Sequence, residues 1–143
     1  MSGAYPSLLR KRSLAMLRLA EELLDKGEYD LAALNAEYAV QLYVKQLLYR
    51  VTGEEWRGHG LRMLLGTLST VLRQQGFPNE ADKVADYVRS KRRLLAELEE
   101  AHVRAVYGAF EYSREQAQML VETAKNIIST LGKVEGKVVE CAR

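Results

Sequence analysis

The stretch GEYDLAALNAEYAVQLYVKQLLYRVTG, residues 27–53, decides the fold of this chain. Its apolar residues recur at helical spacing on two sides: Leu31, Leu34, Tyr38, Leu42 and Tyr49 on one, and Ala32, Ala36, Ala39, Tyr43 and Leu47 on the other. A helix that is apolar around most of its circumference is normally buried among other helices. We therefore predict that a helix over 30–52 forms the centre of a bundle, with Leu42 and Leu47 almost fully buried.

Helical periodicity continues on both sides of this stretch, and glycines separate the segments. We predict further helices over 7–26, from Leu61 to a stop at Gly76, over about 79–107 and over 113–131, the last of which starts with the capping box Ser113-Arg114-Glu115-Gln116. No two-residue alternation of useful length and no hairpin dipeptide competes with this pattern. The expected fold class is therefore all-α, an up-and-down bundle of about five helices.

The chain is expected to be a single domain, because 143 residues leave little room for a second one. The core of that domain is expected to span residues 8–131. After Gly132 the C-terminal tail, residues 132–143, is expected to fray or to form a short turn.

The composition excludes several classes of protein. The 21 lysines and arginines nearly balance the 19 acidic residues, so no overall basic field draws the chain to nucleic acid. A single cysteine, Cys141, excludes an internal disulfide framework and a cysteine-based zinc site, and it fits a reducing compartment. No stretch approaches 18 uncharged apolar residues, and the N-terminus lacks the apolar run of a signal peptide. We expect no membrane span and a cytoplasmic location.

The sequence offers little recognisable catalytic chemistry. Its two histidines, His59 and His102, form no H-E-x-x-H pattern and cannot build a three-ligand zinc site without carboxylates, so no metal site is predicted. No phosphate-binding G-x-x-x-x-G-K-[ST] loop and no G-x-S-x-G nucleophile elbow occurs. We predict no catalytic residue and no obligatory cofactor.

Two groups of residues have two interpretations each. The basic run Arg89, Lys91, Arg92 and Arg93 is either a solvated helix face or a patch that faces the phosphates of a nucleic acid. Five tyrosines at helical spacing are either core residues with a hydroxyl at the rim or rings that stack on bases; they are Tyr38, Tyr43, Tyr49, Tyr107 and Tyr112.

Three features in order along the chain resemble the HEPN family, the nucleotide-binding domains named for higher eukaryotes and prokaryotes. The first is the central stretch, whose matching positions are Gly27, Tyr29, Ala32, Ala36-Glu37, Ala39, Leu42, Lys45, Leu47-Leu48 and Gly53. The second is a histidine that opens a leucine-rich helix, here His59-Gly60-Leu61. The third is the segment Ala101–Gly108, which is similar to the family's A-Y-x-x-x-R-Y pattern and precedes a loop and a last helix.

The chain departs from the family where ribonuclease members carry their chemistry. Val106 stands where the family has the arginine before its tyrosine, and whether Arg104 replaces that arginine stays open. The ribonuclease motif R-x(4–6)-H is not found, since no histidine follows Arg104 and the basic run precedes His102 by nine residues or more. We therefore expect that this chain is not an enzyme.

The resemblance implies a helical module that binds a nucleotide, for example ATP, or another polyanion. Lys45, Arg57, His59 and Arg104 would be the polar contacts, with Tyr107 as a stacking ring. The resemblance also implies a small, separate nucleotidyltransferase chain as partner, in a pair of the toxin–antitoxin kind. Two alternatives stay open: a metal-independent ribonuclease toxin with a non-standard Arg/His pair, and a structural dimeric scaffold.

Two further expectations concern assembly and the binding groove. Two-fold pairs are the commonest soluble assembly, so we expect a homodimer. We expect free backbone N–H groups at the start of the helix after His59, which would suit a phosphate. That helix start should lie near Thr52, roughly 10 Å from Lys45 at 1.5 Å per residue, so a nucleotide rather than a single phosphate would reach both.

Overall fold

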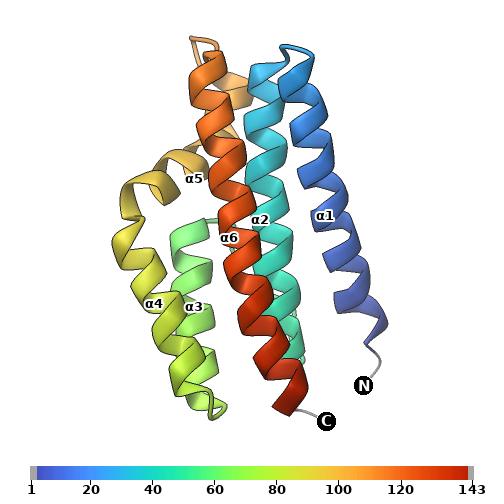
Figure 1. Ribbon diagram of the computed structural model, residues 1–143, viewed down its shortest axis with the longest axis vertical. Coiled ribbons are helices and arrows are strands. Elements are labelled where there is room, and N and C mark those ends of the chain that lie inside the picture. The colour runs from blue at the N-terminus through green and yellow to red at the C-terminus, as the bar shows by residue number, and fades with distance from the viewer. Residues whose placement is uncertain (1–2, 142–143) are drawn as a thin grey trace.

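The computed structural model describes residues 3–141, and these form six α-helices and no strand. The helices are α1 (Ala4–Asp25), α2 (Tyr29–Thr52), α3 (Leu61–Gln74), α4 (Pro78–Ser90), α5 (Arg92–Tyr107) and α6 (Arg114–Cys141). The three longest, α1, α2 and α6, run side by side along the molecule, and both ends of the chain lie at the same end of the bundle (Figure 1). The predicted all-α bundle is confirmed. Among the described residues, no helix has both the length and the hydropathy that a membrane crossing requires.

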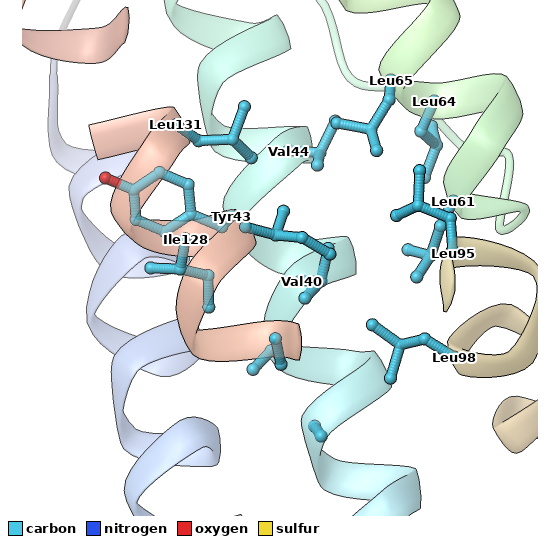
Figure 2. Close-up of a cluster of buried hydrophobic side chains, with 14 of the residues drawn as sticks. Val40, Tyr43, Val44, Leu61, Leu64, Leu65, Leu95, Leu98, Ile128 and Leu131 are labelled. Carbon is cyan, nitrogen blue, oxygen red and sulfur yellow. The ribbon is translucent and has the colours of Figure 1, made fainter. Parts of the chain in front are cut away.

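Helix α2 is the central helix, as predicted. It packs against α1, α3, α5 and α6. In Figure 2, Tyr43 points toward Ile128 and Leu131 of α6, and Val44 faces Leu65 of α3. Leu47 is 1% exposed, which confirms its predicted burial.

The same prediction is wrong for Leu42, which is only half-buried. Its side chain lines a surface cavity between α1, α2 and the loop that follows α2. The apolar periodicity of α2 therefore overstated its burial, because one side of the helix borders a groove instead of another helix.

Glycines and a capping box set several helix ends where the sequence placed them. Gly27, Gly53 and Gly76 have φ angles of 79°, 76° and 90°, a left-handed conformation that costs glycine little. The predicted capping box at the start of α6 is also confirmed. The Gln116 N–H donates to Ser113 Oγ at 3.1 Å, and the Ser113 N–H donates to Gln116 Oε1 at 2.9 Å.

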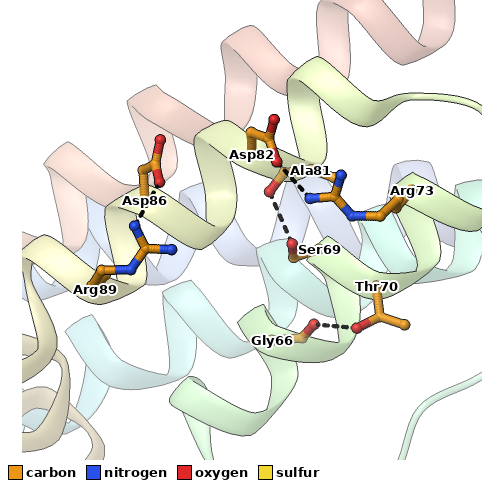
Figure 3. Close-up of polar contacts among 8 residues, drawn as sticks. All are labelled: Gly66, Ser69, Thr70, Arg73, Ala81, Asp82, Asp86 and Arg89. Carbon is orange, nitrogen blue, oxygen red and sulfur yellow. Dashed lines mark hydrogen bonds and ion pairs between the residues drawn. The ribbon is translucent and has the colours of Figure 1, made fainter.

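The predicted single helix over 79–107 is wrong, because it divides at Lys91 into α4 and α5. Lys91 leaves the helical conformation with φ −115° and ψ 22°. Before this break, α4 pairs with α3, where Ser69 Oγ donates to the Ala81 carbonyl at 2.8 Å (Figure 3). After it, α5 turns toward α2 and buries Leu95 and Leu98. A straight helix could not follow both partners, and this division gives six helices instead of five.

The expectation for the C-terminal tail is also wrong over the described part, since α6 continues through Gly132 to Cys141. Val134 and Val138, at 2% and 6% exposure, extend the buried stripe of α6 by two more turns. Glu135 accepts a hydrogen bond from Gln46 of α2 and pairs with Arg10 of α1 at 3.4 Å. These contacts outweigh the cost of about 1 kcal/mol that a glycine adds inside a helix. Residues 142 and 143 lie outside the described residues.

Candidate functional site

A cavity of about 400 Å³ lies between the first turns of α1, the second half of α2 and the loop from α2 to α3. We call it the α1–α2 groove. It is lined by Tyr5, Leu9, Leu42, Lys45, Tyr49, Glu55, Trp56, Arg57 and His59. Three of the five predicted contact residues, Lys45, Arg57 and His59, thus line one cavity although up to 14 positions separate them in the sequence.

Lys45 supplies the cation on the wall of the groove that α2 forms. Its side chain is half-buried, and burial lowers its pKa from the ordinary value of 10.5. The nearby carboxylate of Glu37 acts in the opposite direction and raises the pKa. Arg57 and His59 are more exposed and reach the groove from the loop. An anion in the groove would therefore meet positive charge from two elements.

Aromatic rings form much of the remaining wall. Tyr5 and Tyr49 pack edge to face, with ring centroids 5.2 Å apart and an interplanar angle of 72°. The Trp56 indole N–H donates to Thr52 Oγ1 at 3.4 Å, which ties the loop back to the end of α2. A hydrogen bond to Glu55 raises the pKa of Tyr5, so this phenol stays neutral. Flat apolar rings beside cations are the surface that a base and its phosphates require together.

A buried carboxylate organises the polar side chains beside the groove. Glu37 of α2 is 0% exposed, and its two oxygens have separate partners. Oε1 lies 2.9 Å from Nδ1 of His102 on α5, and Oε2 accepts a hydrogen bond of 2.6 Å from Nε2 of Gln41. The other end of the Gln41 amide, Oε1, lies 3.3 Å from Nδ1 of His59. We call these four residues the histidine network.

The two histidines of this network are stacked on one another. Their ring centroids are 5.9 Å apart and their planes differ by only 10°. Tyr38 covers His102 as well, with a centroid distance of 5.1 Å. Burial raises the pKa of Glu37, and the hydrogen bonds from Gln41 and His102 work against that rise. A carboxylate, an amide and two imidazoles thus converge at the edge of the groove that His59 lines.

The start of α3, directly after His59, is not open to a phosphate as expected. The Arg62 N–H donates to Glu99 Oε1 at 3.1 Å, and the Arg62 guanidinium pairs with the same carboxylate. The Leu61 backbone also contributes a hydrogen bond to Glu99. A carboxylate from α5 therefore already occupies the positive end of this helix, and the expectation of free N–H groups there is corrected.

Arg104 and Tyr107 do not line the groove, contrary to the expectation that they contact the same ligand as Lys45, Arg57 and His59. The Arg104 guanidinium lies over the ring of Tyr112, 5.5 Å from its centroid, and borders a different hollow between α5 and α6. Tyr107 is 82% exposed at the end of α5. Both side chains face away from the groove, because the side of α5 that carries His102 packs against α2.

The basic run lies at the corner between α4 and α5, with all four of its side chains exposed. Arg89 pairs with Asp86 at 3.2 Å, and Arg93 borders the same hollow as Arg104. The run is therefore separate from the α1–α2 groove.

Sequence reasoning missed Glu37, Gln41 and His102 as members of the site. Glu37 and Gln41 were the signal that could have found them, because they stand four residues apart on one face of a largely apolar helix. A carboxylate in such a helix needs a partner when buried. The partner histidine, 65 positions away, is visible only in the fold.

The chain was compared with known proteins. No match was found among curated proteins or among solved structures. Residues 7–134 match the family model of the HEPN domain, which covers most of the 143 residues and includes the helices that build the groove and the histidine network. The sequence pattern of the central helix and this match agree, and the chain therefore belongs to the HEPN domain family.

Proposed function

We propose that this HEPN domain binds a nucleotide or a similar polyanion in the α1–α2 groove and is not itself catalytic. The observation that carries the proposal is that Lys45, Arg57 and His59 line one cavity of about 400 Å³ together with aromatic rings. Two cations beside a half-buried apolar wall favour a ligand with both negative charge and a flat ring. Phosphates would bind Lys45 and Arg57, and the base would pack against Tyr49 or Trp56.

Calorimetry with ATP and magnesium tests this proposal. Lys45→Ala is expected to weaken binding about tenfold or more, since a hydrogen bond to a charged group contributes about 1.5–3 kcal/mol. Lys83→Ala is the matched control, because Lys83 is an exposed lysine of α4 outside the groove. Equal binding by wild type and Lys45→Ala would refute this site and would direct attention to the basic run from Arg89 to Arg93.

We propose a small nucleotidyltransferase chain as the partner, as the family resemblance implies for a pair of the toxin–antitoxin kind. The partner's metal would then add binding energy for the same nucleotide. The test is the calorimetric titration repeated with a purified nucleotidyltransferase present. Tighter ATP binding by the mixture than by either protein alone supports the pairing, and unchanged binding contradicts it.

A homodimer is the expected assembly, and an exposed apolar patch supports it. Val103, Val106, Tyr107 and Phe110, at the end of α5 and in the loop after it, are between 54% and 82% exposed. Val103, Val106 and Tyr107 are spaced to share one face of α5, and an exposed apolar face of this kind favours an interface. Light scattering at micromolar concentration is expected to give a dimer mass, and Phe110→Asp is expected to give a monomer. Met63→Asp, at an exposed apolar side chain of α3, is the control; a monomeric wild type would refute the dimer.

RNA cleavage is a second candidate function, and the stacked histidines favour it. Metal-independent cleavage needs a base for the 2′-hydroxyl and an acid for the leaving oxygen. His59 and His102, 5.9 Å apart, could divide these tasks, with Lys45 nearby at the phosphate. RNA cleavage by the purified protein in the presence of EDTA, abolished in both His59→Ala and His102→Ala, would support this function over simple binding. A protein that neither cleaves RNA nor binds ATP would instead be a structural scaffold.

A further inference from the structure

The hydrogen-bonding direction of the histidine network follows from the buried carboxylate. In its ionised form Glu37 only accepts hydrogen bonds, and the Gln41 amide nitrogen then donates to its Oε2 at 2.6 Å. The amide oxygen then faces His59 Nδ1 at 3.3 Å, and an oxygen acceptor requires a hydrogen on that nitrogen. By the same reasoning, His102 Nδ1 carries the hydrogen that points to Glu37 Oε1 at 2.9 Å.

The Gln41 amide nitrogen and His102 Nδ1 also lie 3.3 Å apart. In this arrangement both atoms are donors, and each directs one hydrogen to a different oxygen of Glu37. The contact between them is therefore a consequence of sharing one carboxylate. Glu37 thus determines the protonated nitrogen of both rings, of His102 directly and of His59 through Gln41.

The position of the His59 ring is fixed from two directions. Gln41, only 2% exposed, holds Nδ1 on the inner side of the ring. His102 supports one face of the ring through the parallel stack. Nε2 lies on the side of the imidazole away from Nδ1 and therefore away from Gln41, and the exposed His59 side chain lines the groove.

We propose that Glu37, Gln41 and His102 are positioning residues that present Nε2 of His59 to the α1–α2 groove as a hydrogen-bond acceptor. Such an acceptor next to Lys45 and Arg57 selects a ligand that carries a hydroxyl donor near its phosphates. The ribose of a ribonucleotide has this chemistry, and its dideoxy analogue lacks it. The inference rests on the proposed nucleotide binding and adds a preference for ribonucleotides.

The protonated nitrogen can be read directly by two-bond ¹H–¹⁵N correlation spectra of the full-length protein near neutral pH. We expect neutral His59 and His102 in the form with hydrogen on Nδ1. Gln41→Met removes both ends of the amide and is expected to release His59 to the Nε2–H form, whereas Gln41→Glu keeps an acceptor for Nδ1 and is expected to retain it. Gln74→Met, at an exposed glutamine of α3, is the control. His59 with hydrogen on Nε2 in the wild type would overturn the proposal.

The ligand preference is measured by calorimetry with ATP and with 2′,3′-dideoxy-ATP. Wild type and Gln74→Met are expected to bind ATP about tenfold more tightly than the dideoxy analogue, because one well-formed hydrogen bond contributes about this factor. Gln41→Met is expected to bind the two nucleotides equally. Equal binding of both by the wild type would overturn the ribose preference and leave the proposed groove intact. If the wild type binds neither nucleotide, the proposed function fails and the ligand preference with it, while the spectra still decide the positioning role.

Discussion

Two leucines of α2, five positions apart, are expected to respond differently to the same truncation. Leu47 is 1% exposed inside the bundle, whereas Leu42 is half-buried on the wall of the α1–α2 groove. Leu47→Ala leaves a cavity that the surrounding helices cannot fill, so we expect a loss of about 3 kcal/mol in the free energy of unfolding. Leu42→Ala opens only space that already joins the groove, so we expect about 1 kcal/mol, roughly half the transfer free energy of a leucine side chain.

Urea denaturation followed by far-ultraviolet circular dichroism measures both values. All variants are compared at one protein concentration, because a dimer adds a concentration dependence to the apparent stability. If the free energy of unfolding depends on urea concentration with the same slope in all variants, then the substitutions change stability without changing the surface that unfolding exposes. If Leu42→Ala costs as much as Leu47→Ala, then the side chain of Leu42 is packed in solution and the groove is not open as described.

Three further substitutions test the ends and surfaces of the helices. Burial acts to raise the pKa of Glu99, but the hydrogen bonds from Arg62 outweigh it and the pKa falls below 4.5. At pH 7, Glu99→Gln should therefore lower the free energy of unfolding by about 1 kcal/mol. This difference should disappear as the pH falls through the lowered pKa, because the wild-type carboxylate is then protonated. Urea denaturation at several pH values checks this, and a constant difference would contradict it. Gly53→Ala is expected to cost about 1 kcal/mol because φ is 76°. Gly66→Ala is expected to raise the free energy of unfolding by about 0.5–1 kcal/mol, because the site is helical and a Cβ would meet nothing within 4 Å. In thermal unfolding, Gly53→Ala should therefore lower the midpoint temperature and Gly66→Ala should raise it.

Local chemistry determined much of the fold. The all-round apolar pattern of residues 30–52 predicted the central helix, because only a helix surrounded by others can bury such a surface. The stops at Gly27, Gly53 and Gly76 and the capping box at Ser113 were readable since each depends on residues within one helical turn. The family pattern was readable for the same reason, as its most specific part lies within the 27 residues from Gly27 to Gly53.

Helix packing decided what periodicity could not. The basic run from Arg89 to Arg93 interrupts the apolar pattern over 79–107 but is compatible with one helix or with two, and the division at Lys91 arises because α4 follows α3 while α5 follows α2. Likewise, Gly132 lies inside α6 because Val134 and Val138 find a core and Glu135 finds Arg10 and Gln46.

For the site, residue type identified the cations, and tertiary structure chose among them. The family resemblance indicated Lys45, Arg57, His59 and Arg104 as the polar contacts of a ligand. Only the fold separated Lys45, Arg57 and His59 from Arg104, because the packing of α5 on α2 decides which side chains of α5 face the groove. Only the fold joined Glu37 to His102 across 65 positions, because the cost of burying a carboxylate is met by whichever partner the packed helices bring to it.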